Sequence, residues 1–387
     1  MNRSSHPARD ARSRARGSLT RRDALRIASG GAAALALGAC SRRDDSPRVV
    51  LYSSVDDVYL REIAAAYERD SGVRVDVVGD TEATKSTGLA ERVIAERARP
   101  RADVWWSSEP FFTIRLAREG LLEPGAARAA LGGGVADRWP SGMMGADGSW
   151  VGFAARARVI VYRASRFGDG GDRFGAVPRT LGALADPAFR GRVAMARPEF
   201  GTTRGHLAAL IELEGAAAVE AWLRAMKANA LRVYPGNSSV VRAVAQGEAD
   251  LGLTDTDDVW AGQRNGWDVA AAFEEAEPAG LPSGPTPGSG PDAGLRSRGP
   301  LVLPNTAGLV RAGPNPEHGR RLLAWILAGH AERLLAASES RNYPVHPDVA
   351  DVGIEPALPA TAWRPDLEGV ADHLDEAASL AARVIDG

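Results

Sequence analysis

Short apolar runs alternate with amphipathic stretches through most of the chain, and a small polar loop follows nearly every run. Runs rich in β-branched and aromatic residues favour strands, and apolar residues spaced three and four apart favour helices. The predicted strands cover residues 48–52, 73–78, 102–106, 156–162, 191–196, 231–234 and 249–253. The predicted helices cover residues 58–69, 88–99, 206–214, 217–229, 319–329 and 374–385. This alternation predicts an α/β fold with mainly parallel sheets flanked by helices.

The 387 residues are enough for two or three domain-sized units, and the alternating pattern restarts near residue 153. We therefore predict one block over residues 48–152, completed by about 301–345, and a second block over 153–273. Residues 274–300 are rich in Pro, Gly and Ser, which predicts a flexible surface loop. Residues 346–387 are predicted to form a C-terminal helical segment.

The N-terminus differs in charge from the rest of the chain. Residues 1–39 contain eight Arg and two Asp, whereas the whole chain has a formal net charge of −2. The pair Arg21-Arg22 precedes an apolar stretch that ends in Leu37-Gly38-Ala39-Cys40, where Cys40 is the only cysteine. This order predicts a twin-arginine signal peptide over 1–39 and a tether over 40–47, with Cys40 lipid-modified as in a lipobox. The acidic remainder argues against nucleic-acid binding.

The sequence lacks the short motifs that identify many enzymes. It has no His-Glu-x-x-His, no Gly-x-x-x-x-Gly-Lys, no Gly-x-Ser-x-Gly and no Cys/His zinc spacing. We therefore predict a protein that is not an enzyme and needs no cofactor. A secreted metal-dependent hydrolase is kept as an alternative of another class.

Polar loops follow the predicted strands, and loops at the carboxyl ends of parallel strands share one rim of a sheet. Free N–H groups at helix starts can bind an anion there, or the hydroxyl and amide side chains can simply cap the helices. Lys85 is one of only two lysines in the chain. It is interpreted either as a functional positive charge in the polar loop or as an ordinary surface residue. The predicted loop residues are Ser53, Ser54, Lys85, Thr202, Thr203, Asn237 and Ser238.

A carboxylate cluster gives the sharpest chemical signal. Asp255, Asp257 and Asp258 lie within four residues, and their charges repel one another. Such a cluster either faces solvent or binds a cation, which could be a hard metal ion or a ligand ammonium group. Glu82 is predicted as a fourth carboxylate of this site.

Several segments together resemble the bacterial extracellular solute-binding proteins of ABC importers, especially the ferric-iron-binding branch. The resemblance covers nearly all of residues 48–350. The segments that carry it are Tyr52-Ser53-Ser54, Ala102-Asp103-Val104-Trp105-Trp106, Arg156-Ala157-Arg158-Val159-Ile160-Val161-Tyr162, Phe189-Arg190-Gly191-Arg192-Val193, Tyr234-Pro235-Gly236-Asn237-Ser238-Ser239, Gly247-Glu248-Ala249-Asp250 and Pro304-Asn305-Thr306-Ala307. It implies a two-lobe periplasmic-binding-protein fold (type II), with a ligand cleft between the lobes.

One position departs from the ferric branch. Its members usually carry an adjacent tyrosine pair where this chain has Asp257 and Asp258. Tyr52 and Tyr59 are the remaining candidate phenolates. Thr202, Thr203 and Arg156 match places where the family often holds a companion anion.

The resemblance implies a lipoprotein that captures a small charged ligand and delivers it to a permease of the inner membrane. The ligand is predicted to be a hard metal ion such as ferric iron with a companion anion, or alternatively a small zwitterion or phosphonate. We also predict a monomer on the periplasmic or extracytoplasmic side, with membrane contact through the lipid anchor only. The predicted ligand-binding residues are Ser53, Ser54, Glu82, Lys85, Arg156, Thr202, Thr203, Asn237, Ser238, Asp255, Asp257 and Asp258, and the metal ligands among them are Glu82, Asp255, Asp257 and Asp258.

Overall fold

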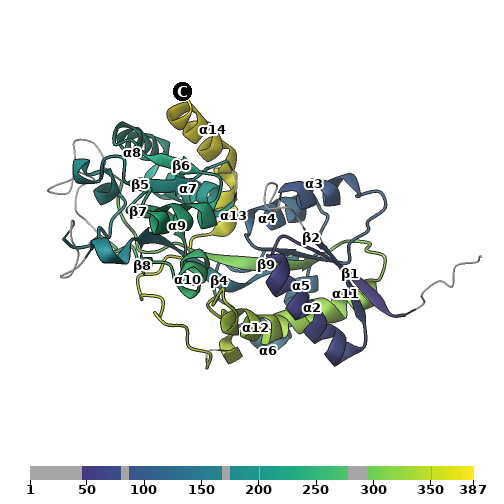
Figure 1. Ribbon diagram of the computed structural model, residues 1–387. Coiled ribbons are helices and arrows are strands. Elements are labelled where there is room, and N and C mark those ends of the chain that lie inside the picture. Colours follow the sequence, from purple (N-terminus) through teal and green to yellow (C-terminus); the bar gives the residue numbers. More distant parts are fainter. Residues whose placement is uncertain (1–45, 80–86, 168–174, 200, 278–294, 350) are drawn as a thin grey trace, which may run out of the picture. The chain divides into compact units, whose positions relative to one another are not determined.

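One mixed β-sheet runs through the protein, and a single long strand joins its two halves (Figure 1). The computed structural model describes residues 46–79, 87–167, 175–199, 201–277, 295–349 and 351–387, and Pro47–Gly387 forms one compact unit. Within these residues the sheet has nine strands in the order β2-β1-β3-β9-β4-β7-β5-β6, with β8 paired to β4. The strands are β1 (Arg48–Ser53), β2 (Arg74–Gly79), β3 (Val104–Ser107), β4 (Trp150–Tyr162), β5 (Val193–Ala196), β6 (Arg232–Tyr234), β7 (Leu251–Asp255), β8 (Ala270–Ala272) and β9 (Val302–Leu309).

Strand β4 belongs to both halves of the sheet. Its first part pairs antiparallel with β9, and its last part, from Arg158 to Tyr162, pairs antiparallel with β7. We call β1, β2, β3 and β9 the first sheet half, and β5, β6, β7 and β8 the second sheet half. Pairing is parallel between β1 and both β2 and β3, and between β5 and both β6 and β7. The predicted α/β fold class is therefore confirmed, with antiparallel strands at the junction.

The helices follow from ordinary start and stop signals. In α2, Leu60, Ile63, Ala64 and Tyr67 are buried at helical spacing, and Gly72 ends the helix with a left-handed φ of 69°. The α-helices are α2 (Asp57–Ser71), α3 (Thr87–Ala95), α4 (Phe111–Arg118), α5 (Ala126–Leu131), α6 (Gly133–Ala136), α7 (Gly201–Glu214), α8 (Ala216–Ala228), α9 (Asn237–Gln246), α10 (Thr256–Arg264), α11 (Pro316–Trp325), α12 (Ala331–Ala337), α13 (Leu367–Asp372) and α14 (Leu374–Ile385).

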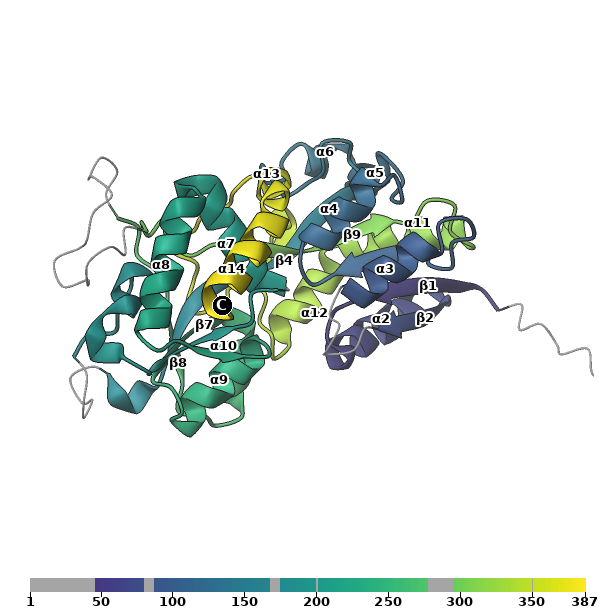
Figure 2. The same ribbon diagram turned by 90° about the horizontal axis from the view of Figure 1, so that it is seen from above.

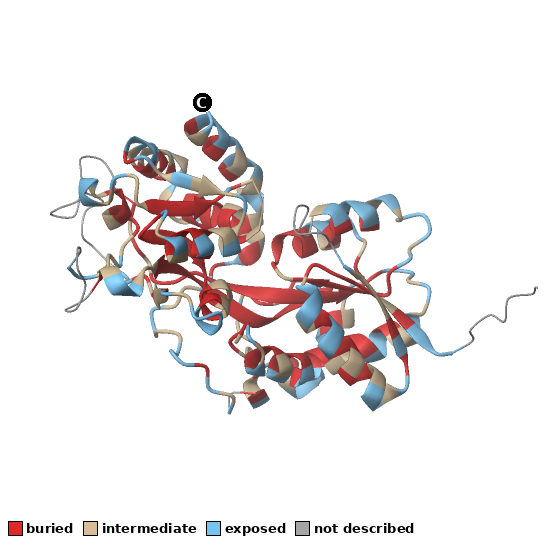
Figure 3. Ribbon diagram, in the orientation of Figure 1, coloured by how far each residue is buried: buried red, intermediate tan, exposed pale blue. Residues whose placement is uncertain are grey.

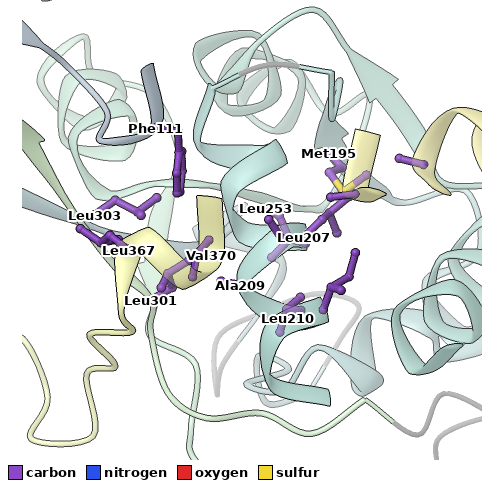
Figure 4. Close-up of a cluster of buried hydrophobic side chains, with 14 of the residues drawn as sticks. Phe111, Met195, Leu207, Ala209, Leu210, Leu253, Leu301, Leu303, Leu367 and Val370 are labelled. Atoms are coloured by element: carbon purple, nitrogen blue, oxygen red, sulfur yellow. The ribbon is translucent and has the colours of Figure 1, made fainter. Parts of the chain in front are cut away.

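The central strands are buried, and many helices are buried along one side only (Figure 3). The largest apolar cluster includes residues of both sheet halves, and α13 adds Leu367 and Val370 to it beside Leu301 and Leu303 (Figure 4). Helix α14 packs on α7 and α8 (Figure 2). The C-terminal helices therefore belong to the core.

Helices α4 and α7 meet closely at a glycine. A Cβ atom at Gly205 would lie 2.0 Å from Cε2 of Phe111, so no larger residue fits there without a shift. This contact brings the start of α7 close to the loop that follows β3.

Some elements begin earlier than predicted. Strand β4 starts at Trp150 rather than 156, because Trp150 and Val151 pair with Gly308 and Ala307 of β9. Helix α7 starts at Gly201 rather than 206. The helix predicted over 319–329 starts at Pro316 and becomes a π-helical turn, Ile326–His330, where Gly329 has a φ of 89°.

The predicted division into domains stays a prediction. Its boundary at 152/153 falls inside β4, which both sheet halves share. The signal peptide over 1–39, Cys40, the tether up to residue 45 and residues 278–294 of the predicted loop lie outside the described residues. Within the described ranges, we find no helix with the length and apolar character needed to cross a membrane.

Candidate functional site

A cavity of about 600 Å³ lies where loops from both sheet halves meet. Most of its walls come from loops that follow strands: β1 and β3 in the first sheet half, and β5, β6 and β7 in the second. This is the position at which open α/β sheets bind ligands. The polar residues of the wall are Asp56, Tyr59, Ser108, Glu109, Arg156, Arg197, Thr202, Thr203, Asn237, Ser238, Ser239, Asp255, Asp257, Asp258, Asn305, Ser340 and Asn342.

A buried ion pair lies in the part of the cavity wall that the second sheet half supplies. The register of β4 and β7 places Arg158 directly opposite Asp255, and Nη1 of Arg158 lies 2.8 Å from Oδ1 of Asp255. Burial by itself raises the pKa of Asp255, but the charges of Arg158 and Arg156 and a hydrogen bond from Thr202 outweigh it. The pKa of Asp255 is therefore held below its usual value, and the residue stays ionised.

The same pair fixes the starts of two helices. Thr202 of α7 donates from Oγ1 to Oδ2 of Asp255 at 2.6 Å. Asn237 of α9 donates from Nδ2 to Oγ1 of Thr202 at 2.8 Å and to Asp255 at 2.9 Å. Gly236 precedes α9 without a side-chain cap. Two helix N-termini, each with a partial positive charge, are thus pinned side by side at the cavity.

The acidic cluster also lies on this wall. One carboxylate oxygen from each of Asp255, Asp257 and Asp258 lies within 4.8 Å of the others. Asp257 and Asp258 stand in the first turn of α10, where the helix dipole favours negative charge. The wall therefore combines two acidic side chains with two anion-attracting helix starts.

The opposite wall comes from the first sheet half. Burial, followed by the negative charges of Asp56, Glu339 and Asp257, raises the pKa of Tyr59 to about 12. Glu109 is buried, which raises its pKa, although it accepts hydrogen bonds from the N–H groups of Phe111 at 2.8 Å and Phe112 at 3.2 Å. The first sheet half thus contributes a phenol and the carboxyl groups of Asp56 and Glu109 to the lining of the cavity.

The structure gathers most of the predicted site residues. Those that line the cavity are Arg156, Thr202, Thr203, Asn237, Ser238, Asp255, Asp257 and Asp258. Ser53 and Ser54 do not line it. Both are buried: Ser53 accepts from the N–H of Val55 at 3.2 Å, and Ser54 contacts the hydroxyl of Ser108 at 3.3 Å. Glu82 and Lys85 lie outside the described residues.

One predicted metal ligand, Asp255, already has several partners in the structure. Two arginines, Thr202 and Asn237 surround the carboxylate of Asp255, which makes it a counter-ion within the wall. Of the two candidate phenolates, only Tyr59 lines the cavity. Tyr52 lies outside it, where its hydroxyl donates to Glu96 at 3.0 Å.

Sequence reasoning missed eight polar wall residues: Asp56, Ser108, Glu109, Arg197, Ser239, Asn305, Ser340 and Asn342. Asp56 and Glu109 belong to loops that follow the first and third predicted strands, and the strand-end rule could have included them. Asn342 lies far from Asp56 and Glu109 in the sequence, and no local pattern marks it.

Comparison with known proteins defines the class of this protein. Residues 48–338 match the family model for the bacterial extracellular solute-binding proteins, and the chain belongs to this family. It is 31% identical over 238 residues to an Fe(3+)-binding periplasmic protein of Serratia marcescens, covering 59% of this chain and 64% of that protein. It is 25% identical over 322 residues to iron uptake protein A1 of Synechocystis, covering 80% and 81%. Among solved structures, iron-bound HitA from Pseudomonas aeruginosa has a TM-score of 0.67 and 25% identity, covering 87% of this chain and 99% of that one.

Proposed function

We propose that this chain is the solute-binding component of an ABC importer, and that it captures ferric iron together with a companion anion. The observation that carries the proposal is the cavity itself, where Asp257, Asp258 and Tyr59 approach the N-termini of α7 and α9. The iron-related names of the Serratia, Synechocystis and Pseudomonas proteins support the choice of metal.

The chemistry of the walls fits a hard cation beside an anion. Carboxylate and phenolate oxygens are hard donors, which suit highly charged metal ions. The helix starts at Thr202 and Asn237 suit the oxygens of an anion. A volume of about 600 Å³ is far larger than a single ion and leaves room for a companion.

The same two-sided chemistry favours one alternative ligand. A small zwitterion or phosphonate could place its ammonium group at Asp257 and Asp258 and its anionic group at the helix starts. The cavity volume lies within the range of small-molecule sites. Organic ligands therefore belong in the same binding screen.

Delivery and location are further parts of the proposal. The twin-arginine pattern and the lipobox-like residues before Cys40 support export and attachment by a lipid at Cys40. The protein would then work on the periplasmic or extracytoplasmic side and pass its cargo to a permease. Mass spectrometry of the protein from its native membrane is expected to find an acylated N-terminal Cys40, and an intact Met1 would contradict the anchor.

Thermal denaturation with ferric nitrilotriacetate, with and without bicarbonate, tests the ligand. A ligand at one hundred times its Kd stabilises the folded state by about 2.7 kcal/mol, so saturating iron is expected to raise the Tm. The double variant D257N/D258N is expected to lose this increase, because its first-turn carboxylates are gone.

The matched control is D375N/E376Q, which removes two adjacent acidic residues from the first turn of α14, outside the cavity lining. This control is expected to keep the wild-type response to iron. An equal increase in wild type and D257N/D258N would contradict the assignment of the cavity. The same assay with an aminophosphonate in place of iron tests the alternative ligand.

A further inference from the structure

Arg156 occupies an unusual place in the cavity wall. It stands on β4, and its side chain is only 9% exposed. Its guanidinium Nε lies 3.4 Å from Oδ2 of Asp255 and 4.0 Å from Oδ2 of Asp257, and its Nη2 donates to the backbone carbonyl of Ser108. The side chain therefore connects the acidic cluster to the loop that follows β3.

Asp255 already has a closer counter-ion. Nη1 of Arg158 lies 2.8 Å from Asp255, a shorter contact than the 3.4 Å from Arg156. Arg156 thus adds a second positive charge beside Asp255, and the next carboxylate near its guanidinium is that of Asp257. Because unlike charges 4 Å apart attract strongly in a partly dry site, Arg156 offsets part of the negative charge that a cation would use.

The surroundings keep this arginine charged. Burial by itself lowers the pKa of Arg156, but Asp257, Asp255, Asp258 and Glu109 more than compensate and raise it above its usual value. Replacement by a neutral side chain would therefore remove a full positive charge from the acidic cluster.

The contacts of Arg156 differ from those of an anion-binding arginine. Its hydrogen bond goes to a carbonyl oxygen and its nearest side chains are carboxylates. The polar side chains at the two helix starts are instead contacted by Arg158, at 3.3 Å from Oγ1 of Thr202 and 3.2 Å from Oδ1 of Asn237. The resemblance had implied that Arg156 faces the companion anion, and these contacts point elsewhere.

We propose that Arg156 is a built-in counter-ion that competes with the bound cation for Asp257 and so lowers the affinity of the cavity for every metal ion. Because of this competition, an ion needs a higher intrinsic affinity to occupy the cavity. An ion that binds weakly then leaves the cavity mostly empty, whereas an ion that binds very tightly still fills it at the same concentration. This inference rests on the proposed function and identifies Arg156 as a residue that sets the affinity of the cavity for cations.

The test compares R156Q with wild type by isothermal titration with Mn²⁺ and by competition for Fe³⁺ from nitrilotriacetate. R156Q is expected to bind both ions about tenfold more tightly, because the competing charge is gone. R156K keeps the charge and is expected to stay within about threefold of wild type. Circular dichroism and melting of the metal-free proteins establish that each variant is folded.

The matched control is R192Q. Nη1 of Arg192 lies 3.4 Å from Oδ2 of the fully buried Asp250, a similar ion pair outside the cavity. R192Q is expected to bind both ions as wild type does. Equal or weaker binding of Fe³⁺ by folded R156Q would overturn the counter-ion role and leave iron capture standing. A folded wild-type protein that takes no Fe³⁺ from nitrilotriacetate would instead overturn the proposed function.

Discussion

Two aspartates two positions apart differ in burial and in pairing at this cavity. Asp255 is buried between two arginines, whereas Asp257 is 24% exposed at the edge of the cavity. The difference comes from the sheet, because Asp255 ends β7 and lies opposite Arg158, while Asp257 belongs to the next helix. A sequence pattern that groups the three aspartates cannot separate these surroundings.

His206 gives a prediction at the same scale. Burial, followed by the charge of Arg158, lowers its pKa to about 3, although Asp255 opposes the shift. The unfolded chain then binds a proton that the folded protein does not, from about pH 6.5 downward, so the stability from this residue is complete above that pH and falls as the pH falls.

We expect the free energy of unfolding of wild type to lose about 1.4 kcal/mol more per pH unit than that of H206Q between pH 6 and pH 4. Urea titrations of both proteins at several pH values measure the difference. Above pH 7.5 the difference between them is expected to be constant. Parallel curves across the whole range would contradict a neutral buried His206.

At the scale of elements, β4 has an irregularity near the junction of the sheet halves. The register with β9 shifts between Phe153 and Ala155, and Ala154 has a φ of 44°. The carboxylate of Glu332, buried at 1% exposure, accepts from the N–H of Ala154 at 2.7 Å, and from Val345 and His346 at 3.0 and 2.9 Å. One side chain thus supplies the acceptor that the interrupted ladder lacks at Ala154, and it also holds the segment at Val345 and His346.

We predict that E332A lowers the free energy of unfolding by about 3 kcal/mol, because three N–H groups, two of them buried, lose their acceptor. Guanidinium denaturation measures the loss. E62A is the control, since Glu62 is exposed on α2, and a change within about 0.5 kcal/mol is expected for it. A small effect of E332A would show that water replaces the carboxylate.

At the scale of the whole molecule, the C-terminal helices complete a core that the rest of the chain leaves uncovered. The family match ends at residue 338, yet Ala377, Leu380, Ala381 and Val384 of α14 are buried against α7 and α8. Helix α7 also supplies Thr202 to the cavity. The site therefore depends on a segment far from it in sequence.

Removal of residues 374–387 is expected to lower stability by about 5 kcal/mol, since the buried side chains of α14 lose their environment. Differential scanning calorimetry is expected to show a Tm about 10 °C lower. Removal of the exposed Asp386 and Gly387 alone serves as the control and should leave the Tm unchanged. An unchanged Tm after the longer deletion would contradict the role of α14 in the core.

The sequence by itself determined the fold class and the general place of the site. Alternating strands and helices are local patterns, and the loops after parallel strands must share a rim, so Thr202, Asn237 and Asp257 could be grouped in advance. Their assignment as ligand-binding residues remains a prediction, to be tested by the variants above.

The tertiary structure decided which charges meet. Whether Arg156 or Arg158 pairs with Asp255 depends on strand register and on distances of a few ångströms, and the spacing in sequence carries neither. The early start of β4 likewise depends on β9, about 150 residues away. Local propensity specifies elements, whereas electrostatic roles arise only when distant elements pack, because Coulomb energies depend on separation and burial.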